Sequence, residues 1–339
     1  MELAEVTTLR LGGPARTVIE ATDERTLIDA VRIADEAGDP VLIVGGGSNL
    51  VVADEGFDGT VVLVRTGGIS VNADACSGAT VTVAAGEDWD AFVARAVDEE
   101  WVGVEALAGI PGSTGATPIQ NVGAYGQDVS QTIVSVRVFD RYDRRIRTVM
   151  HDDCRFGYRS SAFKAELQRY VVLSVTFQFR LGDLSAPVAY AELARTLGVE
   201  LGERAPLARV REAVLALRRG KGMVLDPGDH DTWSAGSFFT NPILRPEQAD
   251  GLPAEAPRFE QPDGRIKTSA AWLIDHAGYG KGYGPGPVRL STKHPLALTH
   301  RGGGSTEQLL ALAREVRDGV ERRFGVRLVN EPVLVGAEL

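Results

Sequence analysis

Apolar residues alternate with polar ones along several stretches, which is the pattern of half-buried β-strands. In residues 171–181 every second residue from Val171 to Leu181 is apolar, and residues 79–85 and 134–138 show shorter alternations. Residues 41–44 and 60–65 are short apolar runs of the kind found in buried strands. The pattern therefore predicts strands in these five places, with faces free to bind a second layer.

Other stretches repeat their apolar residues at the spacing of an amphipathic helix. The strongest is the last one, because Ser305 and Gln308 form a capping box and Gly325 provides a stop. The predicted helices are one over Leu27, Ile28, Val31 and Ala34 that ends at Gly38, one carrying Trp89, Phe92, Val93, Ala96 and Val97, one from Pro206 to Gly220, a short one within 269–278, and the one that follows Ser305. Residues 326–336 are predicted to return as a strand.

Strands and helices thus follow one another without a repeat, and the fold class they predict is α+β. A length of 339 residues fits about two domains. A boundary is expected at residues 182–187, where glycine, proline and polar residues follow the longest predicted strand.

Two glycine-rich segments stand out between the predicted elements. The first, Gly45-Gly46-Gly47-Ser48-Asn49-Leu50, directly follows a predicted strand, where backbone N–H groups often converge on a phosphate. It is not the dinucleotide fingerprint GxGxxG, because Leu50 occupies the last glycine position, and it lacks the GK[ST] of a P-loop.

The second segment, residues 109–127, holds five glycines and two prolines between regions of clear periodicity. A loop of this length inside a domain is usually functional or disordered, and its apolar and amide residues argue against disorder. We expect a backbone cradle for a flat or phosphorylated ligand. The competing interpretation is a surface connection with several turns.

Charge and cysteine content narrow the classes of partner. The formal net charge of −10 and a pI near 5.1 disfavour nucleic acid or an anionic membrane as a partner. Cys76 and Cys154 form no CxxC pair, and the N-terminus lacks the features of a signal peptide, so a reducing cytoplasm is expected. The five histidines show no ligand spacing, and no metal site is expected.

Polar residues later in the chain are candidates for handling protons and charge: Arg159, Lys221, Ser237 and Glu331. Taken singly, each is more often an ordinary surface or turn residue. A serine-hydrolase role for Ser237 lacks a GxSxG elbow and an identifiable histidine base. These residues alone predict a protein that binds a nucleotide-like ligand.

A family resemblance extends this interpretation. The two glycine segments, together with Tyr158-Arg159-Ser160-Ser161, resemble the FAD-binding domain of the UDP-N-acetylenolpyruvoylglucosamine reductase family (MurB). Residues 236–242, 270–275 and 330–332 resemble the later motifs of the same family in the same order. Tyr190-Ala191-Glu192-Leu193 resembles the tyrosine-bearing substrate loop of its longer subtype.

The resemblance implies an FAD-binding domain of the PCMH or vanillyl-alcohol-oxidase type in two lobes, residues 1–70 and 71–182. A C-terminal α+β substrate-binding domain, residues 183–339, would follow, and its last strand is expected to return to the first lobe. The protein is expected to be cytoplasmic, with its oligomeric state open and a monomer favoured.

The implied reaction is the reduction of the enolpyruvyl ether of UDP-N-acetylglucosamine to UDP-N-acetylmuramate in peptidoglycan precursor synthesis. FAD would be the noncovalent cofactor and NADPH the hydride donor. By the same resemblance, Arg159 and Glu331 polarise the substrate carboxylate, and Ser237 protonates the carbon next to it.

The remaining site residues are also implied by the resemblance. The expected FAD-binding residues are Gly45, Gly46, Gly47, Ser48, Asn49, Leu50, Gly112, Ser113, Gly115, Ala116, Ile119, Gln120, Asn121 and Gly123. The expected substrate-binding residues are Tyr158, Tyr190, Lys221 and Asn241. Thr240 stands where members of the family often have a basic residue. For Ser291 to His294, the substrate contacts of the family cannot be aligned residue by residue.

Two alternatives remain at this point. One is an FAD-dependent oxidase of the same superfamily, which often attaches its flavin to a histidine or cysteine that neither loop contains. The other is a non-catalytic nucleotide-binding protein, disfavoured by the joint presence of Arg159, Ser237 and Glu331.

Overall fold

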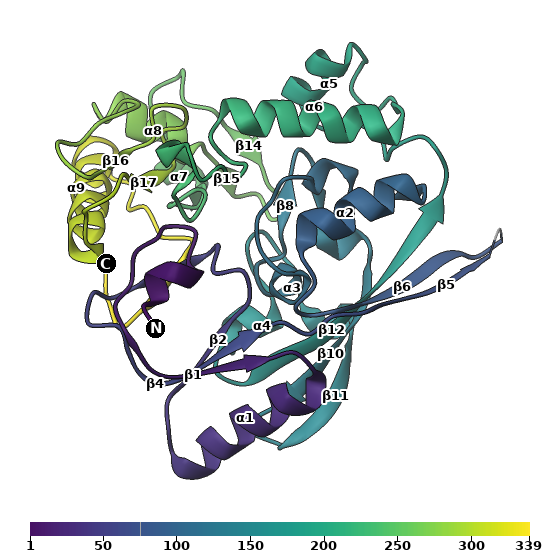
Figure 1. The fold of residues 1–339 in the computed structure, drawn as a ribbon. Helices are drawn as coiled ribbons and strands as arrows, with labels where there is room; N and C mark the ends of the chain where they lie inside the picture. Colours follow the sequence, from purple (N-terminus) through teal and green to yellow (C-terminus); the bar gives the residue numbers. More distant parts are fainter. Residues whose placement is uncertain (75) are drawn as a thin grey trace. The chain divides into compact units, whose positions relative to one another are not determined.

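The computed structural model describes residues 1–74 and 76–339 and divides them into two compact units (Figure 1). Unit 1 consists of Met1–Ala15, Gly47–Phe57 and Gly220–Leu339, and unit 2 of Arg16–Gly46 and Asp58–Arg219. These boundaries differ from the expected division at residues 70 and 182, because the chain leaves unit 2 for residues 47–57 and unit 2 continues through Arg219. The mixed α and β composition agrees with the predicted fold class.

A small sheet in unit 2 has the order β1-β4-β2, formed by Ala15–Ala21, Phe57–Val64 and Val41–Val44, with β2 parallel to β4. Helix α1 (Glu24–Ala37) lies beside this sheet (Figure 1) and buries Leu27 and Val31. Asp23 caps its N-terminus, and Gly38 caps its C-terminus in the left-handed region. The predicted helix and its stop are confirmed.

The larger sheet of unit 2 has the order β11-β10-β12-β6-β5, and β7 also pairs with β12. Its strands are Arg145–Met150 (β11), Ile133–Asp140 (β10), Tyr170–Leu181 (β12), Gly78–Ala84 (β6), Ile69–Asp74 (β5) and Trp101–Val102 (β7). Their pairing is antiparallel, with Phe177 opposite Val81. The alternation predicted for residues 171–181 therefore corresponds to one long strand.

Helix α2 (Trp89–Asp98) packs its apolar face into an aromatic cluster, as its spacing predicts. The ring centroids of Phe92 and Phe177 are 5.3 Å apart in a stacked arrangement, and those of Trp89 and Phe92 are 5.7 Å apart. These side chains are fully buried. They therefore form core rather than ligand contacts.

Short elements complete unit 2. They are α3 (Thr117–Gln120), α4 (Ala162–Ala165), α5 (Ala191–Leu197), α6 (Leu207–Gly220), β8 (Gly123–Ala124), β9 (Gln127–Asp128), and 3-10 turns at Glu105–Leu107, Thr114–Ala116, Val129–Gln131 and His151–Cys154. The segment expected to be a loop, residues 109–127, thus contains short helical turns. Pro118 is compatible with them because it lies in the first turn of α3, where its missing N–H is not needed.

Unit 1 contains short strands and three helices among the described residues. The strands are β3 (Leu50–Val52), β13 (Ile243–Leu244), β14 (Phe259–Glu260), β15 (Ile266–Lys267), β16 (Val288–Leu290), β17 (Leu298–His300) and β18 (Val333–Val335), and the helices are α7 (Pro246–Asp250), α8 (Ala270–His276) and α9 (Thr306–Phe324), with 3-10 turns at Leu3–Val6 and His230–Thr232. Ser305 and Gln308 form the predicted capping box of α9.

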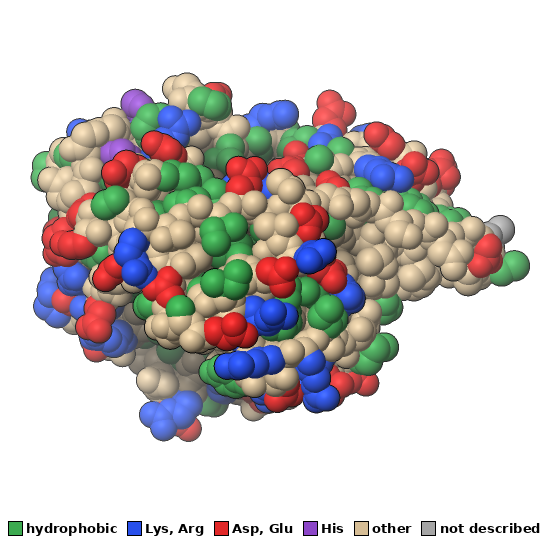
Figure 2. Space-filling model, turned by 60° about the horizontal axis from the view of Figure 1, so that its bottom comes forward, with side chains coloured by type: hydrophobic (Ala, Val, Ile, Leu, Met, Phe, Trp, Pro, Cys, Tyr) green, Lys and Arg blue, Asp and Glu red, His purple; other side chains and the backbone are tan. Residues whose placement is uncertain are grey.

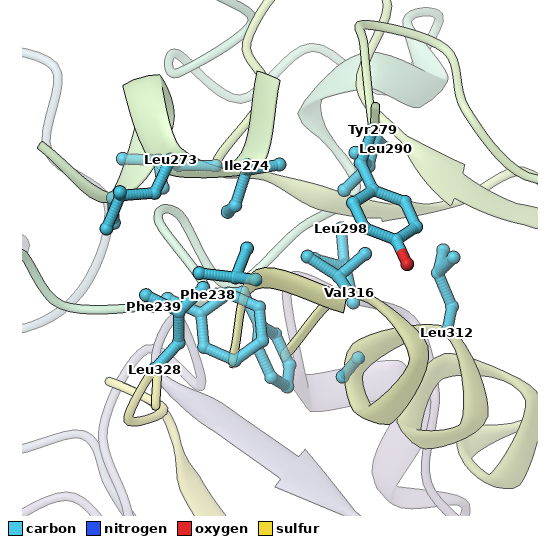
Figure 3. Packing of buried hydrophobic residues seen from close by; sticks show 14 of the residues in the cluster. Phe238, Phe239, Leu273, Ile274, Tyr279, Leu290, Leu298, Leu312, Val316 and Leu328 are labelled. Atoms are coloured by element: carbon cyan, nitrogen blue, oxygen red, sulfur yellow. The ribbon is translucent and has the colours of Figure 1, made fainter. Parts of the chain in front are cut away.

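One core cluster of unit 1 surrounds two adjacent phenylalanines (Figure 3). Phe238 and Phe239 are almost fully buried, and Leu273, Ile274 and Leu328 belong to the same cluster. Val316 and Leu312 bring α9 into it. The segment that carries Ser237 is therefore anchored in the core directly after that serine.

The strand expected over residues 326–336 is wrong in its extent, because β18 covers only Val333–Val335. Before Pro332 the chain forms an isolated antiparallel bridge between Asn330 and Phe239, and the proline, which has no N–H to donate, separates this bridge from β18. β18 then pairs in parallel with β3.

The carboxylate of Asp140 on β10 is fully buried and binds two arginines. Arg169 donates to it at 2.8 Å and Arg147 at 3.1 Å. Burial alone would raise the pKa of Asp140, but the hydrogen bonds outweigh burial and lower that pKa to about 2.

This pKa predicts how stability depends on pH. A carboxyl whose pKa is lower in the folded chain stabilises it above pH about 4, and the contribution is lost as pH falls towards about 2. We expect Asp140→Asn to reduce the free energy of unfolding at pH 7 by about 2–3 kcal/mol. The free energy of unfolding of this variant should also decrease less than that of the wild type as the pH is lowered, and urea unfolding at several pH values measures both effects. Asp143→Asn is the control, because Asp143 contacts the same arginines but its side chain is 40% exposed. Equal stability of the Asp140 variant and the wild type would contradict the role.

Figure 2 shows acidic and basic side chains interspersed on one face of the molecule. Within residues 1–74 and 76–339, no helix is both long and apolar enough to span a membrane.

Candidate functional site

The start of the first glycine-rich segment contacts the second segment in unit 2. Gly45 and Gly46 follow β2, and a Cβ added to Gly46 would lie 2.6 Å from the Cα of Gly112. A Cβ on Gly45 would lie 2.1 Å from the Oγ of Ser113. The two backbones therefore touch, which only glycine permits at position 46.

We expect Gly46→Ala to weaken FAD binding at least tenfold, because the new Cβ must push the two segments apart. Flavin fluorescence titration of the cofactor-free protein measures the change. Gly182→Ala is the control, since a Cβ there would meet its nearest atom at 3.9 Å. Unchanged FAD affinity in the Gly46 variant would show that the contact does not shape the cradle.

The first half of the 109–127 loop is fixed to the backbone after β6. Thr114 N donates to the carbonyl of Glu87 and Gly115 N to that of Ala85, each at 2.8 Å. The hydroxyl of Thr114 is buried without a hydrogen-bond partner within the described part of the chain. A buried polar atom of this kind fits a site that a polar ligand completes.

The second half of the loop is bound by the segment around α4. Ser161 Oγ donates to the Ile119 carbonyl at 2.7 Å, and Lys164 Nζ donates to Gln120 Oε1 at 2.9 Å. Asn121 Nδ2 donates to the carbonyl of Gly157 at 3.1 Å. The structure thus brings the predicted loop and the predicted basic segment together.

Arg159 lies over the end of this loop half. Its Nη2 donates to the Gly123 carbonyl at 2.9 Å and its Nη1 to the Asn121 carbonyl at 3.4 Å. The guanidinium carbon is 5.6 Å from the Tyr158 ring centre, and Arg159 has a positive φ of 51°. A non-glycine residue in this conformation is uncommon and often occurs at functional sites.

Tyr190 reaches the far end of the loop. Its ring meets that of Tyr125 edge-on at 5.4 Å, and it directly precedes α5. Its side chain remains 43% exposed, which leaves it accessible to a ligand.

Arg218 near the end of α6 is a site residue that the sequence analysis did not name. Burial lowers the pKa of Arg218 to about 10, and the charge of Arg159 acts in the same direction, whereas Tyr125 and Asp90 oppose it. A half-buried arginine that feels the charge of Arg159 adds positive charge to this part of unit 2. The Arg-Arg pair at the helix end gave no sign of which arginine turns inward.

Ser237 and Glu331 are neighbours in unit 1. Glu331 N donates to the carbonyl of Phe238 at 2.9 Å, and Phe239 and Asn330 form an antiparallel bridge. Phe238 N in turn donates to Leu296 at 2.7 Å. The backbone thus fixes the segment of Ser237 against that of Glu331.

Asn49 of the first glycine segment also belongs to this group, since its carbonyl accepts from Val333 N at 2.9 Å. Its Nδ2 lies 3.5 Å from the Glu331 carbonyl. Gly47, Ser48 and Leu50 accompany it in unit 1. The predicted site residues therefore fall into two groups, each described within its own unit.

The predicted diphosphate ligands lie apart from one another in sequence. Asn241 Oδ1 accepts from Ala270 N at 3.0 Å at the start of α8, which fixes its side chain. Lys221 is half-buried directly after α6. Gly115, Ala116 and Tyr158 belong to unit 2.

Substrate contacts could not be assigned from the sequence for Ser291 to His294. In the structure, acidic residues of the same unit bind this region. Asp231 accepts from Thr292 N at 2.8 Å and from Arg301 at 2.5 Å. Lys293 pairs with Asp229 at 2.5 Å and thereby lowers the pKa of Asp229. Among residues 1–74 and 76–339 no group of three or more metal-ligating side chains converges.

Comparison with known proteins identifies both parts of the chain. Residues 15–149 match the FAD binding domain family, and residues 226–335 match the C-terminal domain of UDP-N-acetylenolpyruvoylglucosamine reductase.

Full-length relatives are similar throughout. A UDP-N-acetylenolpyruvoylglucosamine reductase of Cutibacterium acnes is 59% identical over 340 residues, which cover 99% of this chain and 90% of the relative. A reductase of the same name from Streptomyces coelicolor is 58% identical over 348 residues, with the same two coverages. The crystal structure of UDP-N-acetylenolpyruvylglucosamine reductase (MurB) from Thermus caldophilus shares the fold, with a TM-score of 0.65, 23% identity, and coverage of 99% of this chain and 97% of that one. The chain therefore belongs to the UDP-N-acetylenolpyruvoylglucosamine reductase family.

Proposed function

We propose that this protein reduces the enolpyruvyl ether of UDP-N-acetylglucosamine to UDP-N-acetylmuramate, a step of peptidoglycan precursor synthesis, with NADPH as the reductant. Family membership over the full chain supports the reaction. The structural observation that carries the proposal is the pairing of the Ser237 segment with that of Glu331, because it joins a proton donor and a carboxyl group from distant parts of the chain.

The residues present fit FAD as the cofactor. Gly46 lets the backbones of the two glycine-rich segments touch, and the unpartnered hydroxyl of Thr114 lies in the second of these segments. Residues Gly45, Ser113, Gly115, Ala116, Ile119, Gln120, Asn121 and Gly123, together with Gly47 to Leu50, would complete the binding residues. When bound, FAD supplies hydride transfer from NADPH to the enolpyruvyl double bond.

Arg159 would bind the substrate carboxylate. Reduction of the double bond places negative charge on the carbon beside that carboxylate, and a guanidinium presents two donors in a fixed fork to the charge. The carbonyls of Gly123 and Asn121 hold the guanidinium in place before substrate arrives. Such preorganisation is usually the largest single contribution to catalysis.

Glu331 would act on the same carboxylate as Arg159. A charged glutamate would repel the developing charge, so Glu331 would act either protonated or by holding the arginine. Its backbone is fixed by Phe238 and Asn49, which limits where the side chain can reach.

Ser237 would donate the proton that completes the reduction. An alcohol is a weak acid, but carbon beside a carboxylate that carries negative charge is basic enough to accept its proton. The following phenylalanines are buried in the core of unit 1, so the backbone of Ser237 is rigidly supported (Figure 3).

The nucleotide sugar would be bound through its diphosphate by Tyr190, Lys221 and Asn241, with Tyr158 nearby. Tyr190 is the residue that would assign the chain to the longer subtype of the family. Its exposed ring and its support by Tyr125 suit a residue that receives a ligand. A cytoplasmic location and a monomeric state complete the proposal.

The deciding experiment is an absorbance measurement on the purified protein. We expect a noncovalent flavin spectrum that NADPH bleaches under anaerobic conditions and that the enolpyruvyl substrate restores. A colourless protein that FAD does not reconstitute would refute the function. A flavin that oxygen reoxidises but the substrate does not would favour an oxidase of the same superfamily.

A further inference from the structure

Tyr190 is carried by a segment, residues 183–190, that lies between β12 and α5. We call it the Tyr190 segment. It pairs with the residues before α6, since Ser185 N donates to Ala205 and Val188 N to Glu203, each at 2.8 Å. These bonds hold one edge of the segment. The other edge faces the end of the 109–127 loop.

A fully buried carboxylate, that of Glu105, connects the two. Its Oε1 accepts from Ala186 N at 2.7 Å and from Gln127 Nε2 at 2.8 Å, and its Oε2 accepts from Gly103 N at 2.7 Å. Gln127 is fixed in turn, because its Oε1 accepts from Ala106 N at 2.8 Å. A single carboxylate thus bonds the loop end and the Tyr190 segment together.

A second contact follows three residues further along the segment. Gly126 has a φ of 86°, and a Cβ there would lie 2.8 Å from the Cβ of Ala189. Next to it, the rings of Tyr125 and Tyr190 meet edge-on. The position of the Tyr190 ring therefore depends on how closely the segment lies against the loop.

We propose that Glu105 is a positioning residue that holds the Tyr190 segment against the loop and thereby sets the affinity for the nucleotide-sugar diphosphate, without touching the substrate. The inference rests on the proposed function, in which Tyr190 meets that diphosphate. A carboxylate can accept all three hydrogen bonds, whereas a leucine of similar size accepts none and leaves the N–H groups of Gly103 and Ala186 and the amide of Gln127 without an acceptor. A buried donor left without an acceptor is costly, so the segment detaches more often.

The consequence is a weaker apparent affinity rather than altered chemistry. Substrate must then bind a segment that is positioned for only part of the time, and the apparent dissociation constant rises by the inverse of that fraction. Flavin binding and reduction by NADPH do not involve the Tyr190 segment in the proposed function and should stay as they are.

Glu105→Leu in the full-length, FAD-loaded protein tests the proposal, and retention of bound FAD shows that the variant is folded. We expect hydrogen exchange of Ala186 and the rest of the Tyr190 segment to accelerate at least tenfold. The KM for the UDP-sugar should rise roughly tenfold, while the rate of flavin reduction by NADPH changes less than twofold. Asp35→Asn is the matched control, because it replaces a carboxylate held by Arg141 in the same unit and should leave all three quantities unchanged.

A double-mutant cycle shows whether Glu105 acts through Tyr190. The effects of Glu105→Leu and Tyr190→Phe on KM should be less than additive. Unchanged exchange in the Tyr190 segment, unchanged KM despite faster exchange, or equal slowing of flavin reduction would each overturn the proposal. If Tyr190→Phe alone leaves KM unchanged, the assigned substrate role of Tyr190 fails, whereas faster exchange in Glu105→Leu still supports the positioning of the segment.

Discussion

Ser237→Ala is expected to leave reduction of the bound flavin by NADPH intact and to slow its reoxidation by the enolpyruvyl substrate by about 10²- to 10⁴-fold. The hydroxyl is the proposed proton source, and the methyl group of alanine has no proton to give. The backbone around it should not move, because Phe238 is bonded to Leu296 and Glu331 through its N–H and carbonyl. Stopped-flow absorbance measures the two half-reactions separately.

Comparing Ser237→Cys with Ser237→Ala distinguishes the loss of the proton donor from a change in the shape of the side chain. A thiol occupies nearly the same place and is the stronger acid, so this variant should recover part of the lost rate. Equal slowing of both half-reactions in Ser237→Ala would reject the proton-donor role and indicate a disturbed cofactor site.

Arg159→Lys should slow the substrate half-reaction by about 10²- to 10³-fold, which is the usual effect of removing one preorganised donor from developing charge. Lysine keeps the positive charge but cannot present two parallel donors to a carboxylate. It also cannot maintain both bonds to the carbonyls of Asn121 and Gly123. Single-turnover reoxidation of the reduced protein measures the effect.

Arg155→Lys is the matched control, since Arg155 lies in the same segment but its side chain is 67% exposed. It should behave as the wild type. If Arg159→Lys instead releases FAD, Arg159 supports the loop rather than the substrate carboxylate.

The sequence predicted those elements whose signals are local. The cap residue Ser305 and the stops Gly38 and Gly325 marked two helices correctly, because capping involves residues within one turn. The alternation of apolar and polar residues identified β12, because this pattern also depends only on residues that are close in sequence. The strand before Gly336 was overextended because periodicity does not register the effect of Pro332 on pairing.

The candidate site residues were predicted through a family resemblance. The residues that hold them in position were not predicted. Arg159, Ser237 and Glu331 stood in identifiable motifs. Glu105 did not, because its partner Ala186 is distant in sequence and donates through its backbone, which every residue but proline could supply. The inward orientation of Arg218 is likewise decided by tertiary packing.

The parallel pairing of β3 with β18 constrains the order in which the chain can mature. Unit 2 is fully synthesised once Arg219 has emerged from the ribosome, and its antiparallel sheet can form while translation continues. Leu50 and Val51, by contrast, can pair with Val333 and Leu334 only after the long span between the two strands has been translated. While that span is made, β3 lacks its partner strand, and an unpaired strand exposes its backbone N–H and C=O groups to other chains until β18 pairs with it.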